Sequence, residues 1–287
     1  MYILLKLRKC LASSWHDEPF KPLFIYDGFL SSTYDFCPYF GRDKSKMTQH
    51  YISMLERLSS RTVLELGTAT GVLSLAPLDA GFFVDTVDYS WDMQLAAKSK
   101  LNHFEENMQN RIHFILSDVT MFQPSKRYGA IIIPDSLLTI IQEDQWLPLL
   151  KNCYDALEND GVLLFDMYKP LDITGEGYTD VARFRDNDHN VYIVEVNHKN
   201  FPQKQLQKSD YHYRKRLSFH RYIDVARITI NYHYKYLYQI VEALKAAGFL
   251  NIESKINSTA EFILFLHTNL MTKRALGGMI YIKSSLI

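Results

Sequence analysis

Along the middle of the chain, short continuous apolar runs alternate with longer stretches whose apolar residues fall at helical spacing. The apolar runs lie at residues 62–66, 82–87, 112–116, 128–133 and 161–167. Between the last two runs, residues 143–159 have the period of an amphipathic helix. Continuous apolar runs are typical of strands buried on both faces of a parallel sheet. The alternation therefore predicts an α/β fold with a doubly wound, mostly parallel seven-stranded sheet.

Further elements extend this pattern on both sides. Residues 45–59 and 237–248 are predicted to be helices, and another helix is expected to begin after Ser90, which is a natural N-cap. The second of these helices leads into a strand at 250–256. Residues 277–283 are predicted to be the last strand, paired with the sheet as a hairpin.

Residues 178–235 have no helical period and instead show three or so alternating strands. Antiparallel strands with short connections do not belong in a parallel core, so we interpret them as an inserted β-sheet lid or substrate subdomain. The predicted units are an N-terminal extension, a core in two parts and this insert: 1–24, 25–177 with 236–287, and 178–235. The aromatic-rich segment 26–42 is expected to cover a pocket.

The first strand leads directly into the glycine turn Glu65-Leu-Gly67-Thr-Ala69-Thr-Gly71, and the second strand ends in Asp88. This arrangement suits an adenosine, because glycines let the backbone approach a ligand and an acid accepts both ribose hydroxyls. The spacing fits neither the G-x-G-x-x-G fingerprint of dinucleotide sites nor a phosphate-binding P-loop. We therefore disfavour a nucleotide-dependent oxidoreductase.

Composition narrows the function further. The formal net charge is +0, so a global basic field for nucleic acid is absent. Three widely separated cysteines argue against a disulfide framework and a zinc site, and no metal is expected. The first residues lack the apolar core of a signal peptide, and no apolar run is long enough to span a bilayer. These features favour a cytoplasmic protein with no membrane association.

The string from Glu65 to Gly71 resembles motif I of the class I S-adenosylmethionine-dependent methyltransferases, E-x-G-x-G-x-G, with Ala69 in place of the middle glycine. Residues 87–93, 117–118 and 241–249 are similar to the same family. The subfamily that the chain resembles most is the bacterial N-methyltransferases of natural-product amines and amino sugars. The resemblance implies S-adenosyl-L-methionine as cofactor, S-adenosyl-L-homocysteine as product, and methyl transfer to a small-molecule amine.

The resemblance also implies site residues. The cofactor contacts would be Tyr34, Glu65, Gly67, Thr68, Ala69, Gly71, Asp88, Tyr89, Met93, Asp118, Val119 and Pro134. The glycine turn would hold the methionine moiety, Asp88 the ribose, and Met93, Asp118 and Val119 the adenine. Tyr39 is the closest match to the tyrosine near the transferred methyl group in relatives, which makes it the catalytic candidate.

Acceptor contacts are expected at Tyr26, Arg42, Asp135, Ser136 and Tyr168. The histidine that follows the fourth strand in some sugar-amine relatives is not matched by Asp135-Ser-Leu-Leu-Thr139, which argues against an amino sugar.

Two other readings of the same sequence stay open. An RNA or protein methyltransferase would use the basic strands at 199–221, where the sequence shows only Asp210 as a nearby acid. A non-catalytic partner subunit would bind the cofactor without turning it over. A homodimer is also open.

Overall fold

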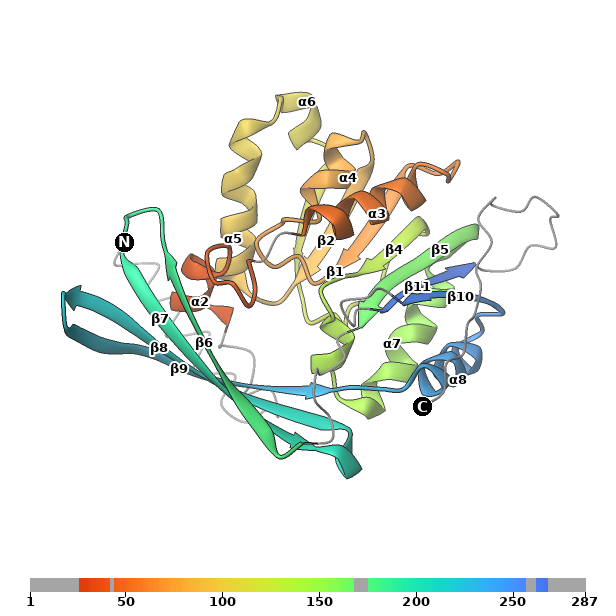
Figure 1. Ribbon diagram of the computed structural model, residues 1–287. Coiled ribbons are helices and arrows are strands. Elements are labelled where there is room, and N and C mark those ends of the chain that lie inside the picture. The colour runs from red at the N-terminus through yellow and green to blue at the C-terminus, as the bar shows by residue number, and fades with distance from the viewer. Residues whose placement is uncertain (1–25, 42–43, 168–174, 257–261, 268–287) are drawn as a thin grey trace, which may run out of the picture.

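A computed structural model describes residues 26–41, 44–167, 175–256 and 262–267. The predictions for residues 1–24, Arg42, Tyr168 and 277–283 fall outside these ranges. Within them the chain forms two sheets, one with helices on both faces and one whose inner face packs against the segment after Tyr26 (Figure 1).

The larger sheet has seven strands in the order β10-β11-β5-β4-β1-β2-β3. Its strands are β1 (Thr62–Leu66), β2 (Phe83–Asp88), β3 (Ile112–Leu116), β4 (Tyr128–Ile133), β5 (Leu157–Met167), β10 (Asn251–Ile256) and β11 (Phe262–His267). The first five pair in parallel, and β11 is antiparallel to both β5 and β10. The predicted doubly wound, mostly parallel sheet is therefore confirmed.

The strand β11, which forms a hairpin with β10, was not predicted from the sequence. One predicted boundary also differs from the structure. The strand β5 begins at Leu157, because Leu157 already pairs with Tyr128, so Asp160-Gly161 lies inside the strand instead of stopping the preceding helix. A shift in register after Tyr128 accommodates these extra residues.

The helices and short helical turns are α2 (Phe29–Thr33), α3 (Ser45–Leu55), α4 (Leu75–Asp79), α5 (Trp91–Lys100), η2 (Leu101–His103), α6 (Glu106–Gln109), η3 (Leu137–Ile140), α7 (Glu143–Asp155), η4 (Pro202–Lys204) and α8 (Leu237–Ala247). The predicted N-cap of α5 is confirmed, since the Ser90 hydroxyl accepts from the Met93 amide at 3.1 Å. Gly248 ends α8 with φ 112°, a left-handed conformation that favours glycine.

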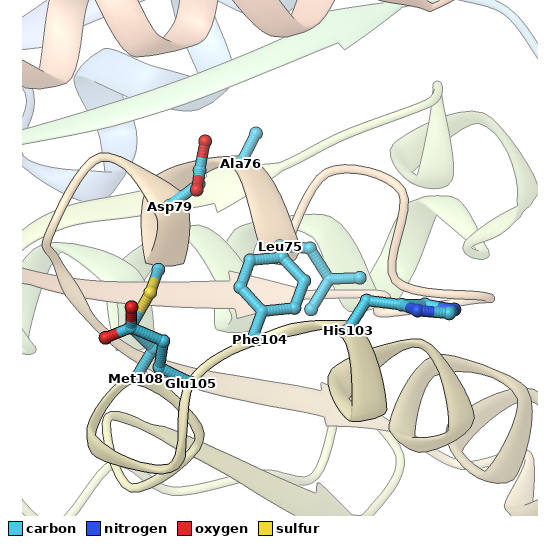
Figure 2. A pocket seen from close by; sticks show the side chains of 7 residues that line it. All are labelled: Leu75, Ala76, Asp79, His103, Phe104, Glu105 and Met108. Atoms are coloured by element: carbon cyan, nitrogen blue, oxygen red, sulfur yellow. The ribbon is translucent and has the colours of Figure 1, made fainter.

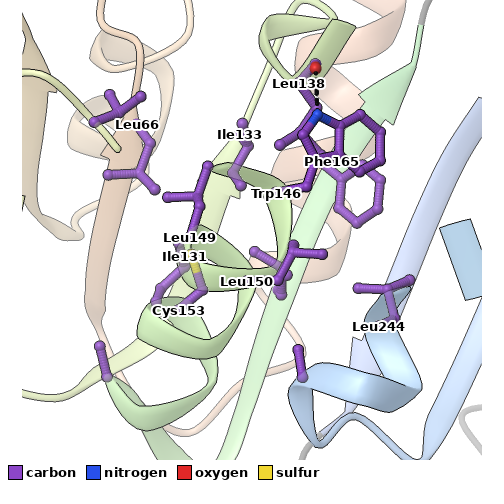
Figure 3. Close-up of a cluster of buried hydrophobic side chains, with 14 of the residues drawn as sticks. Leu66, Ile131, Ile133, Leu138, Trp146, Leu149, Leu150, Cys153, Phe165 and Leu244 are labelled. Carbon is purple, nitrogen blue, oxygen red and sulfur yellow. Dashed lines mark hydrogen bonds between the residues drawn. The ribbon is translucent and has the colours of Figure 1, made fainter. Parts of the chain in front are cut away.

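Alternate residues of the central strands face two separate cores, one on each side of the sheet. Val63 and Ile132 pack with the side that carries α3 and α4. Leu64 and Ile131 pack with the side that carries α7 and α8. Figure 3 shows the second core, in which the Trp146 indole donates to the Leu138 carbonyl at 3.0 Å. This two-sided burial explains why the strands are apolar at nearly every position.

The smaller sheet is antiparallel, in the order β6-β7-β8-β9. Its strands are β6 (Gly177–Arg185), β7 (Val191–Phe201), β8 (Leu206–Ser218) and β9 (Arg221–His233). The last three match the alternating strands that the sequence indicated, whereas β6 was not predicted as a strand. Alternate side chains of the sheet pack against Leu30, Tyr34, Cys37 and Phe40. Among the described residues, no helix is long and apolar enough to cross a bilayer.

Candidate functional site

In the glycine turn after β1, every second residue has a left-handed backbone conformation. Gly67, Ala69 and Gly71 have φ values of 96°, 45° and 78°. A Cβ at Gly67 would approach Leu137 Cδ2 to 2.8 Å, and one at Gly71 would approach the Cβ of Ala97 to 2.8 Å. Only glycine fits both the conformation and the space at these two positions. Ala69 occupies the middle position with the same backbone geometry at some cost in strain.

Asp88 joins this turn to the tip of β2. Its Oδ2 accepts from the Ala69 amide at 2.8 Å, and its Oδ1 accepts from the Ser90 amide at 2.8 Å. Burial raises the pKa of Asp88 to about 6, against the opposing effect of these two amides. The carboxylate therefore lies beside the turn with its orientation fixed, and each oxygen keeps acceptor capacity for a further donor.

Glu65 is buried behind the turn. The hydroxyls of Ser74 and Thr86 both donate to its Oε2, the latter at 3.1 Å. Within the described part of the chain, its Oε1 is buried and has no hydrogen-bond partner. Burial raises the pKa of Glu65 to about 8, although the two hydroxyls favour the charged form. A buried acceptor with no donor is costly, so this atom fits a cationic or donor group of a ligand.

The aromatic-rich segment after Tyr26 is held to the glycine turn and to α5 by several polar contacts. The Ser90 hydroxyl donates to Asp27 at 2.6 Å, and the Gly28 amide donates to Asp92 at 2.8 Å. Asp35 accepts from the Thr70 hydroxyl at 2.5 Å. These contacts hold the segment against the glycine turn and α5, and its role in covering a pocket stays a prediction.

A second polar group follows β4. The Asp135 Oδ2 accepts from Lys44 Nζ at 2.6 Å and from the Tyr34 hydroxyl at 3.2 Å. The Lys44 side chain is only 7% exposed, and its ammonium lies 5.3 Å from the centroid of the Tyr34 ring. Lys44 was not predicted as a site residue, because a lysine at the start of a helix is expected to be exposed to solvent. The fold brings it to Asp135 across 91 positions.

The remaining predicted cofactor residues lie along the same edge of the sheet. Met93 is buried in α5, and Tyr89 packs edge-on against Tyr26 with ring centroids 6.3 Å apart. After β3, Asp118 accepts from the Thr120 amide at 2.7 Å, and Val119 is buried. Thr68 donates its amide to the Val87 carbonyl at 3.2 Å, and Pro134 ends β4.

Tyr39 occupies a different place from Tyr34. Its ring packs edge-on against Tyr211 of the small sheet, with centroids 6.0 Å apart. Burial raises the pKa of Tyr39 to about 12, and the charge of Asp180 acts in the same direction. Tyr39 therefore lies toward β6, whereas Tyr34 makes the direct contact with Asp135. The structure brings Asp135 together with Tyr34, and Ser136 follows in the same turn.

The small sheet supplies acids that the sequence did not associate with its basic strands. Arg214 pairs with Glu195 across β7 and β8 at 3.5 Å, and His212 pairs with Asp224 at 2.8 Å. Arg227 pairs with the same Asp224 at 3.1 Å. The sequence showed only Asp210 as an acid near the basic strands. The prediction of a basic face with little compensating negative charge was therefore incomplete. Cross-strand pairing brings in acids that are distant in sequence.

A shallow hollow lies away from all of these residues, between α4 and the turn that joins η2 to α6 (Figure 2). It has a volume of about 480 Å³ and is lined by Leu75, Ala76, Asp79, His103, Phe104, Glu105 and Met108. None of the predicted site residues contributes to it. Among the described residues, no group of three or more histidine, cysteine or acidic side chains is placed to hold a metal ion.

Comparison with known proteins identifies the core. Residues 63–161 match the sequence model of a family described as a methyltransferase domain. By this match, residues 63–161 are assigned to a methyltransferase domain. The match covers β1 to the start of β5, which includes the glycine turn, Asp88 and Asp118. It confirms the family that the motif around Gly67 indicated.

A curated relative of the methyltransferase domain is the glycine/sarcosine N-methyltransferase of Halorhodospira halochloris. It is 28% identical over 170 residues, which make up 58% of this chain and 59% of the relative. Across the curated relatives that it matches best, the chain spans about half to three fifths of their length.

Solved structures share the fold beyond the methyltransferase domain itself. The CcbJ methyltransferase from Streptomyces caelestis has a TM-score of 0.68 at 17% identity, covering 85% of this chain and 98% of that one. CalS10, an amino pentose methyltransferase from Micromonospora echinaspora solved with S-adenosylmethionine bound, has a TM-score of 0.64 at 13% identity, covering 80% and 94%. Both likenesses extend over at least 80% of this chain, well beyond the third that the family model matches.

Proposed function

We propose that this protein transfers a methyl group from S-adenosylmethionine to an amine nitrogen of a small-molecule acceptor. The observation that carries the proposal is the pairing of the glycine turn with Asp88 through the Ala69 amide, at 2.8 Å. In that geometry the acid at the end of the second strand lies beside the glycine turn, where the hydroxyls of a ribose would donate hydrogen bonds to Asp88. When bound, the cofactor supplies a methyl group on a positively charged sulfur.

The charges around the turn suit this cofactor. Glu65, Asp88, Asp135 and Asp166 are all buried or half-buried near one another, and Lys44 is the cation among them. The cofactor has a cationic sulfur and a cationic amino group, so a surplus of carboxylates favours its binding. The Oε1 of Glu65 would accept from the amino group, and Lys44 would pair with the carboxylate.

The residues assigned to the acceptor have to orient a neutral amine behind the methyl group and keep water out. Asp135, with Tyr34 and Lys44 on the same oxygen, is the polar group that we assign to this task. Tyr26, Tyr34 and Tyr39 would line the acceptor's path between the covering segment and the small sheet. Positioning of this kind supplies roughly 7–11 kcal/mol of a displacement barrier without acid–base chemistry.

Two features support a small acceptor over a macromolecule. The segment after Tyr26 is tied down over the glycine turn, which leaves the covered site suited to a small molecule. The paired acids on the small sheet also reduce the basic field that RNA binding requires. The curated relative is named a glycine/sarcosine N-methyltransferase. That name supports an amine as the acceptor of this protein.

The direct test has two arms. Calorimetry with S-adenosylhomocysteine measures cofactor binding, and transfer of a labelled methyl group is then assayed with glycine, sarcosine, simple aliphatic amines and an amino sugar. We expect micromolar binding and turnover with at least one amine. Binding without turnover on any amine would favour the non-catalytic partner, and activity on RNA that falls steeply with salt would favour an RNA methyltransferase. In that assay Tyr39→Phe should lower turnover; unchanged turnover would remove Tyr39 from the catalytic role.

A further inference from the structure

Two consecutive residues after β4 have a backbone conformation that side chains disfavour. Asp135 has φ 54° and Ser136 has φ 60°, and neither is glycine. Left-handed conformations cost roughly 1–2 kcal/mol for each such residue, and they persist only where the surroundings impose them. The turn therefore needs a support. Neighbouring residues supply part of it, since the Leu137 amide donates to the Pro134 carbonyl at 3.2 Å and the Thr139 amide to the Ser136 carbonyl at 2.8 Å. The amides of Asp135 and Ser136 themselves are bound by a residue distant in sequence.

The support is the carboxylate of Asp166 on β5, which is completely buried. Its Oδ1 accepts from the Asp135 amide at 2.8 Å, and its Oδ2 accepts from the Ser136 amide at 2.9 Å. The Ser136 hydroxyl also donates to Oδ2, at 3.1 Å. One side chain therefore binds both left-handed amides at once, which orients the turn.

A second buried residue fixes the direction of Asp166. Tyr51 of α3 is fully buried, and its hydroxyl donates to Asp166 Oδ1 at 2.8 Å. Each oxygen of Asp166 thus receives two donors, so the carboxylate has little freedom to turn. The opposite side of the turn faces the site, where the Asp135 carboxylate meets Lys44 and Tyr34. The same turn starts η3, whose Leu137 fills the space beside Gly67.

We propose that Asp166, held by Tyr51, is a positioning residue that sets the direction of the Asp135 carboxylate toward the acceptor and packs Leu137 against the glycine turn. The inference rests on the proposed function, because it assigns Asp135 to the acceptor. In the part of the chain that the structure describes, the hydrogen bonds of Asp166 come from Tyr51 and from the turn at 135–136. Asp166 acts through the backbone of residues 135 and 136.

The first arm of the test does not depend on activity. Hydrogen exchange of the peptide spanning residues 133–140 is compared in the wild type, Asp166→Asn and Asp85→Asn. Asp85 is a matched control, because it is also a buried strand carboxylate that accepts from a tyrosine hydroxyl, at 2.7 Å from Tyr128. We expect Asp166→Asn to lose protection in this peptide and Asp85→Asn to keep it. Equal protection in all three proteins would overturn the inference.

The second arm measures kcat and KM with the best amine of the panel and cofactor affinity by calorimetry. Asp166→Asn should lower kcat/KM for the amine about 10- to 100-fold while cofactor affinity stays within about threefold, since a displacement of 1 Å has effects of this size. Adding Ser136→Gly to Asp166→Asn should restore part of the loss, because glycine adopts φ near 60° without support. A similar loss in Asp85→Asn, or no restoration by glycine, would indicate a general effect on stability and overturn the positioning role.

If Asp166→Asn does not fold, Tyr51→Phe decides the matter, because it removes only one donor. It should increase exchange at residues 133–140 and raise KM several-fold, and wild-type values for both would overturn the inference. If the wild type transfers methyl to no amine, the proposed function fails, while the exchange comparison still decides whether Asp166 holds the turn.

Discussion

The Ala69 amide donates to the Asp88 carboxylate at 2.8 Å, so the glycine turn and the tip of the neighbouring strand form one unit. The other oxygen of Asp88 accepts from Ser90, the N-cap of α5. A single carboxylate therefore aligns the ends of β1 and β2 and the start of a helix. The geometry leads to the following predictions.

Asp88→Asn should weaken S-adenosylhomocysteine binding roughly 10- to 100-fold. Hydrogen bonds to a charged group are worth about 1.5–3 kcal/mol. The asparagine side chain is uncharged and has only one acceptor oxygen, so it cannot replace the carboxylate. Calorimetry measures the change. Asp79→Asn, at the exposed end of α4, is the control and should bind as the wild type does. Wild-type affinity in Asp88→Asn would show that the ribose lies elsewhere.

Glu65→Gln should remove a pH dependence of stability between pH 6 and 8. The pKa of Glu65 is raised from 4.5 to about 8 in the folded protein, so the native state holds a proton that the unfolded state has released. Stability is then fully present below pH 4.5 and falls as pH rises toward 8, by at most about 1.4 kcal/mol per pH unit.

Asp88 and Asp166 also make the protein less stable as pH rises. Because their pKa values are about 6, this effect lies mostly below pH 6. Burial lowers the pKa of His198 and His233, which contribute in the opposite direction near pH 6.

The difference between the wild type and Glu65→Gln in urea unfolding at pH 6, 7 and 8 therefore isolates Glu65. The variant should show a flatter profile, and Glu106→Gln on the surface should keep the wild-type slope. Parallel profiles for the wild type and Glu65→Gln would contradict the assignment.

Ala69→Gly should stabilise the protein by roughly 0.5–1 kcal/mol. Ala69 has φ 45°, and glycine adopts this conformation without the steric cost, although the unfolded chain gains some entropy. The free energy of unfolding in urea measures the effect. Ala76→Gly in α4 is a control of opposite sign, with an expected loss of about 1 kcal/mol. Destabilisation by both substitutions would mean that the strain at Ala69 is negligible.

Tyr34→Phe should raise KM for the amine acceptor about fivefold with little change in cofactor affinity. The variant keeps the ring that stacks on Phe40 and loses only the hydroxyl that donates to Asp135 at 3.2 Å. The typical net contribution of one hydrogen bond is about 1 kcal/mol, and Lys44 still pairs with the Asp135 carboxylate in the variant. Tyr211→Phe, whose hydroxyl meets Tyr232 at 3.0 Å, is the matched control. An equal change in both variants would assign the effect to the small sheet instead of Asp135.

Much of the fold was predictable because the signals are local. Strands β1 to β5 are apolar runs, Ser90 is a cap beside its own helix, and Gly248 ends α8 where the periodicity stops. The strand β6 was missed because its exposed alternate residues, such as Val181, give little contrast with the polar ones.

The sequence by itself determined the order of the elements, the glycine turn and the acid at the tip of the second strand, because each depends on neighbours within a few residues. Only the tertiary structure decided which charges meet. Lys44 reaches Asp135 across 91 positions, and Asp166 reaches the turn at 135–136 across about 30. Such contacts depend on how strands and helices pack against each other. The residues that neighbour Lys44 or Asp166 in sequence do not indicate which distant side chain each will meet.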